Sequence, residues 1–125
     1  MTRKEISTLI IEDEDILIRV YEKWLKVADL IKYKLAKSEI EGYDLVKSNK
    51  FDLIISDTMD SFNCPYGPRI VEKAKSLGQN PVVIALSGSE ENLGLWDRIA
   101  PNYRFEKSEF TPRKLIEIIE KEFPK

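Results

Sequence analysis

Short apolar runs alternate with amphipathic segments along the whole chain. Three of these runs, over 6–11, 51–56 and 81–86, are six residues long and rich in β-branched residues, as buried strands are. The segments 33–36 and 103–106 are shorter and more polar, and they predict two further, shorter strands. Between them, apolar residues recur every three or four positions, which is the spacing of one helix face. This pattern predicts helices over 17–28, 40–47, 68–77, 90–99 and 112–123.

Individual residues refine these helices. Pro68 and Pro112 each fit the first position of a helix, where the missing N–H costs nothing. Thr111 fits the N-cap before Pro112, and Gly78 fits the end of the helix that Pro68 opens. The weakest pattern, over 40–47, predicts a buried side that carries Ile40, Tyr43 and Val46.

The order of elements is five strand–helix units in succession. Continuous apolar strands that alternate with amphipathic helices predict a parallel sheet with helices on both faces. Right-handed crossovers then give a doubly wound α/β fold. A length of 125 residues without a linker or repeat predicts a single domain over 1–125.

Composition narrows the function classes. Hydrophobic residues make up 42% of the chain and charged residues 34%, which argues against disorder and against a membrane span. The net charge of −2 argues against direct nucleic-acid binding. A single cysteine, Cys64, predicts a reducing, cytoplasmic setting. The chain has no histidine, so chemistry would rest on carboxylates, hydroxyls, lysine or a hard metal ion.

Polar residues follow four of the five predicted strands. Glu12 and Asp13 follow the first, Asp57 the third, Ser87 the fourth and Lys107 the fifth. Each alone has an ordinary interpretation, because acids and serines are common in turns. Together they predict a site, since ligands of open α/β sheets bind beyond the carboxyl ends of the strands.

These residue types fit one chemistry. Clustered carboxylates repel one another unless a cation enters, and oxygen ligands without histidine or cysteine favour Mg²⁺, with Mn²⁺ as an alternative. An aspartate can act as a nucleophile towards phosphorus. Ser87 could donate a hydrogen bond to a phosphoryl oxygen, and Lys107 could pair with another.

The chain resembles the receiver domains of two-component response regulators. The likeness runs from Leu9 to about Phe123. It rests on motifs that occur in the order and near the spacing of the family, namely Ile11-Glu12-Asp13, Ile54-Ile55-Ser56-Asp57, Ala85-Leu86-Ser87-Gly88 and Lys107. The resemblance implies a flavodoxin-like (βα)₅ fold with strand order 2-1-3-4-5.

The resemblance also implies a role for each matching residue. Asp57 matches the phospho-acceptor, which receives its phosphoryl group from a histidine kinase or phosphotransfer protein. Glu12 and Asp13 match the acidic pair that holds Mg²⁺, together with Asp57. Met59 matches the residue whose backbone carbonyl completes the metal site.

The remaining matches concern the response to phosphorylation. Ser87 matches the switch hydroxyl, Gly88 the small residue that leaves the phosphoryl group accessible, and Lys107 the lysine that contacts it. The implied partners are the phosphoryl donor, a downstream output protein or domain, and a second copy in a phosphorylation-dependent homodimer. The domain would catalyse only its own phosphorylation and dephosphorylation, without contacting a membrane or nucleic acid.

Two departures from the family stand out. The glycine that usually lies eight residues after the acceptor is Gly67, ten after Asp57, so the loop over 60–66 is about two residues longer. Arg104 stands where the family often has an aromatic switch residue, with Tyr103 one place earlier. We expect Tyr103 to pack at the strand start and Arg104 to lie at the surface.

Three other functions compete with this one. A pseudo-receiver would keep the fold as an interaction module; the unusual loops keep this alternative open, and the complete set of site residues argues against it. A Mg²⁺-dependent phosphohydrolase usually carries an aspartate two residues after its nucleophile, where this chain has Met59. A flavin-binding protein is the weakest alternative, because the acidic residues 12–15 would repel a phosphate.

Overall fold

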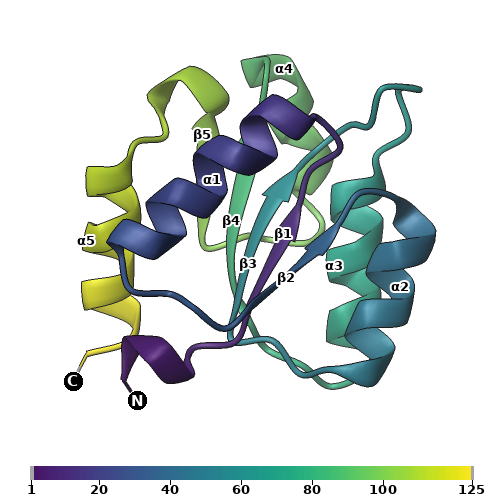
Figure 1. Cartoon of the computed structure of the whole chain (residues 1–125). Coiled ribbons are helices and arrows are strands. Elements are labelled where there is room, and N and C mark those ends of the chain that lie inside the picture. Colours follow the sequence, from purple (N-terminus) through teal and green to yellow (C-terminus); the bar gives the residue numbers. More distant parts are fainter. Residues whose placement is uncertain (1, 125) are drawn as a thin grey trace.

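The computed structural model describes residues 2–124 and contains one parallel sheet of five strands (Figure 1). The strands are β1 (Thr8–Ile11), β2 (Tyr33–Ala36), β3 (Leu53–Asp57), β4 (Val82–Ser87) and β5 (Tyr103–Glu106). Their order across the sheet is β2-β1-β3-β4-β5. This order confirms the predicted doubly wound topology and brings β1, β3 and β4 to the middle.

Helices cover both faces of the sheet. They are α1 (Asp15–Val27), α2 (Glu39–Ser48), α3 (Tyr66–Ser76), α4 (Glu90–Leu93) and α5 (Pro112–Glu122). In Figure 1, α1 and α5 lie on one face, and α2, α3 and α4 lie on the other. Short 3₁₀ turns complete the described chain as η1 (Arg3–Glu5), η2 (Gly94–Trp96) and η3 (Lys107–Glu109).

The core has two layers, one on each side of the sheet. Because successive strand residues point to opposite faces, Ile10 packs towards α1 and α5 while Leu9 and Ile11 pack towards α2 and α3. All residues of β1 and β3 are buried. This double burial explains why apolar residues follow one another over Leu9–Ile11 and Leu53–Ile55 rather than alternating with polar ones.

The predicted strands differ from the observed ones only at their ends. The segments 33–36 and 103–106 coincide with β2 and β5, and the other three begin one or two residues later than predicted. β3 and β4 each extend one residue further, so Asp57 and Ser87 are the last residues of their strands. The predicted helix over 90–99 is broken, because the α-helix ends at Leu93 and a 3₁₀ turn follows.

The helix ends agree with the sequence at α5 but not at α3. Thr111 caps α5, since its hydroxyl accepts a hydrogen bond from the Lys114 N–H, and Pro112 is the first helical residue. Helix α3 begins at Tyr66, two residues before the predicted start at Pro68. The prediction was wrong because proline needs no N–H partner anywhere in the first turn. Gly78 follows α3 with a φ of +87°, as expected of a helix stop.

Helix α2 buries most of the predicted side, since Val46 is buried and Tyr43 packs against the core, but Ile40 does not belong to it. Ile40 is 73% exposed, whereas Gly42 and Val46 are buried. An ideal Cβ on Gly42 would lie 2.2 Å from the Ile70 side chain, so this glycine lets α2 and α3 approach closely. The prediction is therefore wrong for Ile40 and correct for Tyr43 and Val46.

No helix among residues 2–124 has the length and apolar character needed to cross a membrane.

Candidate functional site

Three carboxylates meet at the carboxyl edge of the sheet. Glu12 directly follows β1, Asp13 comes next, and Asp57 ends β3, the strand beside β1. One oxygen of each lies within 4.8 Å of the others. Glu12 is 1% exposed and Asp57 5% exposed, while Asp13 is half-buried. The predicted convergence of these acids is therefore present in the structure.

Lys107 joins two of these carboxylates. It directly follows β5 and is half-buried, and its Nζ lies 3.0 Å from Glu12 Oε1 and 3.0 Å from Asp57 Oδ1. Glu12 Oε1 is buried and has no hydrogen-bond partner with good geometry among the described residues, so this ion pair is its main polar contact. The lysine thus neutralises part of the negative charge.

Burial and mutual repulsion make the acids hard to ionise. Burial, and then the charge of Asp57, raises the pKa of Glu12 from 4.5 to about 7. Burial also raises the pKa of Asp57, although Lys107 opposes this shift. Burial alone would lower the pKa of Lys107, but the charges of Asp57 and Glu12 outweigh it and raise that pKa. One added cation would relieve the remaining repulsion.

The donor set fits a hard divalent cation. Glu12, Asp13 and Asp57 supply carboxylate oxygens only, which are the ligands that Mg²⁺ and Mn²⁺ prefer. The oxygens come from adjacent strands of one sheet, so the backbone fixes their spacing. The group could therefore hold such an ion.

Asp57 is held by three donors. Its Oδ1 accepts a hydrogen bond from the Thr58 N–H at 2.9 Å and faces Lys107. Its Oδ2 accepts a hydrogen bond from the hydroxyl of Tyr66 at 2.8 Å. Tyr66 is fully buried at the start of α3. Burial, and then the charge of Asp57, raises the pKa of Tyr66 far above its usual range, so the phenol is a neutral donor.

Gly67 allows α3 to begin directly against Asp57. An ideal Cβ on Gly67 would lie 1.8 Å from the Asp57 carbonyl oxygen and 2.6 Å from Ser56 Oγ. The Gly67 N–H also donates to the Thr58 carbonyl at 3.3 Å. A glycine is needed here for close approach, and it sets the position of the preceding Tyr66.

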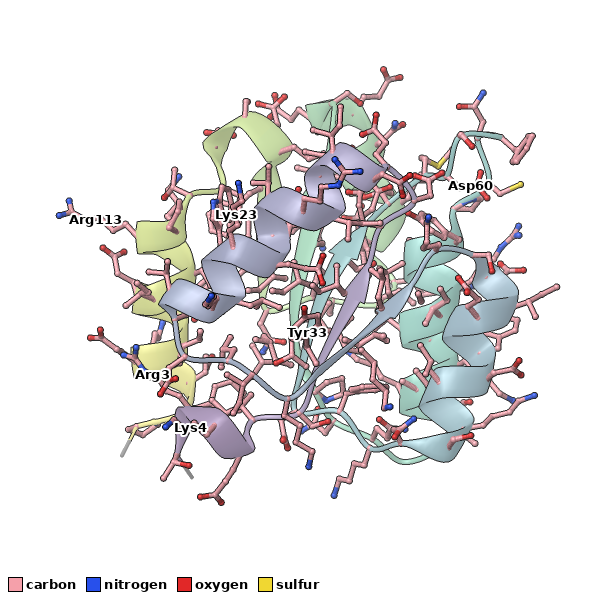
Figure 2. The ribbon with its side chains drawn as sticks, in the orientation of Figure 1. Arg3, Lys4, Lys23, Tyr33, Asp60 and Arg113 are labelled. Carbon is pink, nitrogen blue, oxygen red and sulfur yellow. The ribbon has the colours of Figure 1, made fainter. Side chains whose placement is uncertain are left out.

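The long loop between β3 and α3 is internally hydrogen-bonded. Asp60 Oδ1 accepts from the N–H groups of Phe62 and Cys64, each at 2.9 Å. The Ser61 N–H donates to Asp13 Oδ2 at 2.8 Å, which ties the loop to the carboxylate cluster. Figure 2 shows Asp60 at the end of the molecule opposite Lys4. Cys64 is an exposed free thiol.

The other predicted site residues lie at the same edge of the sheet. Ser87 is buried at the end of β4, and its Oγ accepts a hydrogen bond from the Ser89 N–H at 3.2 Å. Gly88 is exposed, with open space around a hypothetical Cβ. Met59 is half-buried two residues after Asp57. The role of its carbonyl in metal binding stays a prediction.

Thr58 links the site to the segment after β4. Its hydroxyl donates to the Leu86 carbonyl at 2.7 Å and accepts from Trp96 Nε1 at 2.8 Å. Trp96 is fully buried in the core on the α3 side of the sheet. This tryptophan is therefore a core residue whose indole is tied to the residue after Asp57.

The pairing of β5 with β4 shows no shift of one residue that would move Tyr103 into the place of Arg104. Arg104 therefore occupies the position where the family that the chain resembles often has an aromatic residue. Arg104 pairs with Ala85 in β4, and its guanidinium contacts Asp97 and the Leu93 carbonyl, on the α4 side. Tyr103 stacks on Phe105 on the other side of the strand, near α5. The predicted placement of Tyr103 and Arg104 is confirmed, and no aromatic residue occupies this position.

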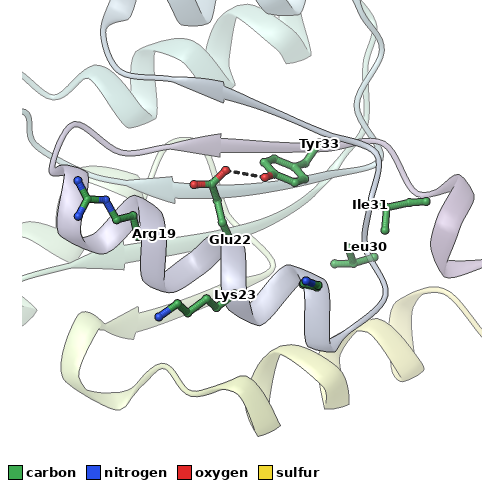
Figure 3. A pocket seen from close by; sticks show the side chains of 7 residues that line it. Arg19, Glu22, Lys23, Leu30, Ile31 and Tyr33 are labelled. Carbon is green, nitrogen blue, oxygen red and sulfur yellow. Dashed lines mark hydrogen bonds between the residues drawn. The ribbon is translucent and has the colours of Figure 1, made fainter.

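A surface groove lies away from the carboxylates. It has a volume of about 550 Å³ and runs between α1 and β2 (Figure 3). Figure 3 shows the Tyr33 hydroxyl directed at the carboxylate of Glu22, to which it donates a hydrogen bond. None of its lining residues belongs to the predicted site.

Sequence reasoning missed Tyr66 and Thr58. Gly67 was the one available signal, since a glycine at that distance from Asp57 indicates close approach of the backbone. The direction of the Tyr66 side chain depends on the path of the long loop, and the spacing of hydrophobic residues does not predict a loop path.

Comparison with known proteins gives a structural answer only. No protein-family model and no curated protein matches the chain. A response regulator receiver domain from Methylobacillus flagellatus has a TM-score of 0.78 at 17% identity, covering 94% of this chain and 98% of that one. A receiver protein from Sinorhizobium medicae WSM419 has a TM-score of 0.78 at 21% identity, covering 97% and 96%.

A third solved structure contains a similar fold within a longer protein. The anti-anti-sigma factor PhyR from Bartonella quintana has a TM-score of 0.71 at 22% identity, and the match covers 90% of this chain and 46% of that one. Identities this low show a shared fold rather than a shared activity. The chain has the fold of the response regulator receiver domains, with strand order 2-1-3-4-5.

Proposed function

We propose that the protein is a phospho-accepting receiver domain of a two-component signalling system. The observation that carries the proposal is the meeting of Asp57 with two further carboxylates and with Lys107 at the carboxyl edge of the sheet. Asp57 is the acceptor. It is 5% exposed and its carboxylate is fixed by three donors, so it is oriented before any donor arrives.

Glu12, Asp13 and Asp57, with the backbone carbonyl of Met59, would hold Mg²⁺ or Mn²⁺. The bound ion would offset the negative charge of the carboxylates and of the incoming phosphoryl oxygens. Lys107 supplies a second positive charge for the phosphoryl group, because its ammonium already lies 3.0 Å from Asp57 Oδ1.

Ser87 would report the phosphorylated state. Its hydroxyl now accepts a hydrogen bond from the Ser89 N–H, just before α4, and its own proton is free to reach a phosphoryl oxygen. Reorientation of Ser87 would change the segment around Ser89 and thereby bias a two-state equilibrium. An output protein or domain that prefers one state would read the change.

The phosphoryl donor lies outside these 125 residues, on another protein or region. The sequence has no histidine, so a phosphohistidine must belong to a histidine kinase or phosphotransfer protein. The domain would catalyse its own phosphorylation and dephosphorylation and would turn over no separate substrate. A phosphorylation-dependent homodimer is part of the same proposal.

Intact mass spectrometry after incubation with acetyl phosphate and Mg²⁺ tests the proposal. We expect one phosphoryl adduct on the wild-type protein, and none on Asp57→Ala or after omission of Mg²⁺. Absence of an adduct on the folded wild-type protein would overturn the assignment.

A second candidate function is an interaction module that works without phosphorylation. Two observations favour it: the loop over 60–66 is about two residues longer than in the family that the chain resembles, and Arg104 stands where that family often has an aromatic residue. The similar fold within an anti-anti-sigma factor is compatible with such a module. The same mass measurement separates the two functions, since only a receiver forms the adduct.

A further inference from the structure

Tyr66 occupies an oxygen of the proposed acceptor. Its hydroxyl donates to Asp57 Oδ2 at 2.8 Å, while Lys107 and the Thr58 N–H contact Oδ1. Among the described side chains, the Tyr66 phenol is the one that hydrogen-bonds Oδ2. Any reaction of the Asp57 carboxylate therefore starts from a group whose Oδ2 accepts this hydrogen bond.

The surrounding packing holds the phenol in place. Tyr66 is 0% exposed and belongs to the core cluster with Ile70 and Trp96. Gly67, directly after it, contacts the Asp57 backbone so closely that no other residue fits. The ring could turn away only if the start of α3 opened, so we expect the hydroxyl to stay near Asp57 after phosphorylation.

We propose that Tyr66 shortens the lifetime of the phosphorylated state by stabilising the free carboxylate of Asp57. This inference rests on the proposed function and concerns how the same site is regulated. Tyr66 would act as a built-in bias towards the unphosphorylated protein, beyond the residues that the family resemblance assigns.

The bias follows from the charge of the acceptor oxygen in each state. In phosphorylation, an Asp57 oxygen forms a bond to phosphorus, and the donor's bond to phosphorus breaks, P–N in a phosphohistidine or P–O in acetyl phosphate, with its electron pair leaving on the donor. In hydrolysis, water attacks phosphorus, the Asp57 O–P bond breaks, and its electron pair returns to the carboxylate. The proton of the water leaves with inorganic phosphate or enters solvent.

A hydrogen bond to an ionised oxygen is roughly twice as strong as one to a neutral oxygen. The Asp57 carboxyl group carries a full negative charge before transfer and loses it in the acyl phosphate. Tyr66 therefore stabilises the charge that develops on the carboxyl group as the O–P bond breaks, which accelerates hydrolysis. The same hydrogen bond makes the free carboxylate a weaker nucleophile.

Tyr66→Phe tests this inference, because it removes the hydroxyl and keeps the buried ring. The protein is phosphorylated with acetyl phosphate and Mg²⁺, the reagent is removed, and the adduct is followed by intact mass. We expect the half-life of the adduct to rise about five- to tenfold, from the difference between charged and neutral hydrogen bonds. Tyr33→Phe is the matched control, since Tyr33 also donates to a carboxylate, that of Glu22, outside the site.

The outcomes separate this inference from the proposed function. No adduct on any of the three proteins would overturn the receiver assignment itself. An adduct with equal half-life on wild type and Tyr66→Phe would overturn only the role of Tyr66. A shorter half-life would also overturn it, because the phenol would then be stabilising the phosphoryl group.

A double-mutant cycle in the absence of metal and phosphoryl donor checks the underlying contact. Urea unfolding in EDTA is compared for wild type, Tyr66→Phe, Asp57→Ala and the double variant. We expect Tyr66→Phe to lower the unfolding midpoint of wild type and to have a smaller effect beside Asp57→Ala. Equal effects in both backgrounds would show that the two side chains are uncoupled and would overturn the inference.

Discussion

Gly67 shows how a single backbone position controls the site. Its missing side chain lets α3 start against the carbonyl of Asp57, where a Cβ would be 1.8 Å away. Two hydrogen bonds come from the chain just before Gly67. The Tyr66 hydroxyl donates to Asp57 Oδ2, and the N–H of the loop residue Ser61 donates to Asp13 Oδ2. The geometry of the acceptor therefore depends on a residue that has no functional group of its own.

We expect Gly67→Ala to destabilise the fold by roughly 3 kcal/mol, the upper part of the range for overpacked positions, because backbone rather than a flexible side chain blocks the Cβ. The measurement is the urea midpoint followed by circular dichroism. Gly94→Ala is the control, since Gly94 has helical backbone angles and open space around its hypothetical Cβ, so we expect no loss of stability and a gain of up to about 1 kcal/mol. Equal losses in both variants would contradict the close-approach explanation.

At the scale of elements, the hydroxyl of Thr58 connects three parts of the chain. It follows β3, donates to the Leu86 carbonyl in β4 and accepts from the indole N–H of Trp96 in η2. Trp96 lies in the short segment between β4 and β5 that also contains Leu93, to whose carbonyl Arg104 donates. A rearrangement next to Asp57 therefore has a direct hydrogen-bonded route to this segment.

Thr58→Val should cost about 1–3 kcal/mol of unfolding free energy, because it leaves the buried Trp96 N–H without its partner and removes the hydrogen bond to the Leu86 carbonyl. Thr58→Ser, which keeps the hydroxyl, should cost clearly less. In a Trp96→Phe background the valine substitution should cost less than in wild type, because the indole N–H that would lose its partner is already absent. Chemical unfolding of the four variants and the wild type gives these differences, and strict additivity would contradict the network.

For the whole molecule, the buried strands made the fold predictable. The apolar runs of β1, β3 and β4 mark the central strands because both faces of the sheet are covered there, and the acids that follow β1 and end β3 must then share one edge. Glu12, Asp57 and Lys107 could be brought together in this way before any coordinates were known.

Features that depend on loops and helix contacts were not predictable in the same way. The start of α3 was missed because Pro68 is tolerated anywhere in a first turn. The exposed Ile40 was missed because the close contact of Gly42 with Ile70 sets the rotation of α2. Tyr66 was missed because the path of the loop over 60–65 decides where its side chain points. In each case a tertiary contact outweighs the local pattern.

The buried acids also give the whole molecule a characteristic dependence of stability on pH. Glu12 has a pKa of about 7 in the folded protein against an ordinary value of 4.5. Between these values the folded state holds a proton that the unfolded state has released, so the free energy of unfolding falls as pH rises. The contribution of Glu12 is fully present below about pH 4.5 and is lost as pH rises through about 7. Asp57, whose pKa is also raised, adds a change of the same sign.

Metal-free protein in EDTA should therefore unfold at lower urea concentration at pH 8 than at pH 5.5. Glu12→Gln should flatten this decline, because an amide does not titrate, whereas Glu117→Gln, at an exposed position on α5, should leave it unchanged. Added Mg²⁺ should stabilise the wild type most at the higher pH, since the cation favours the ionised carboxylates and binds only the folded site. If the urea midpoint of Glu12→Gln declined with pH as steeply as that of the wild type, Glu12 would be ionising normally. The repulsion among the buried carboxylates would then be offset without a cation.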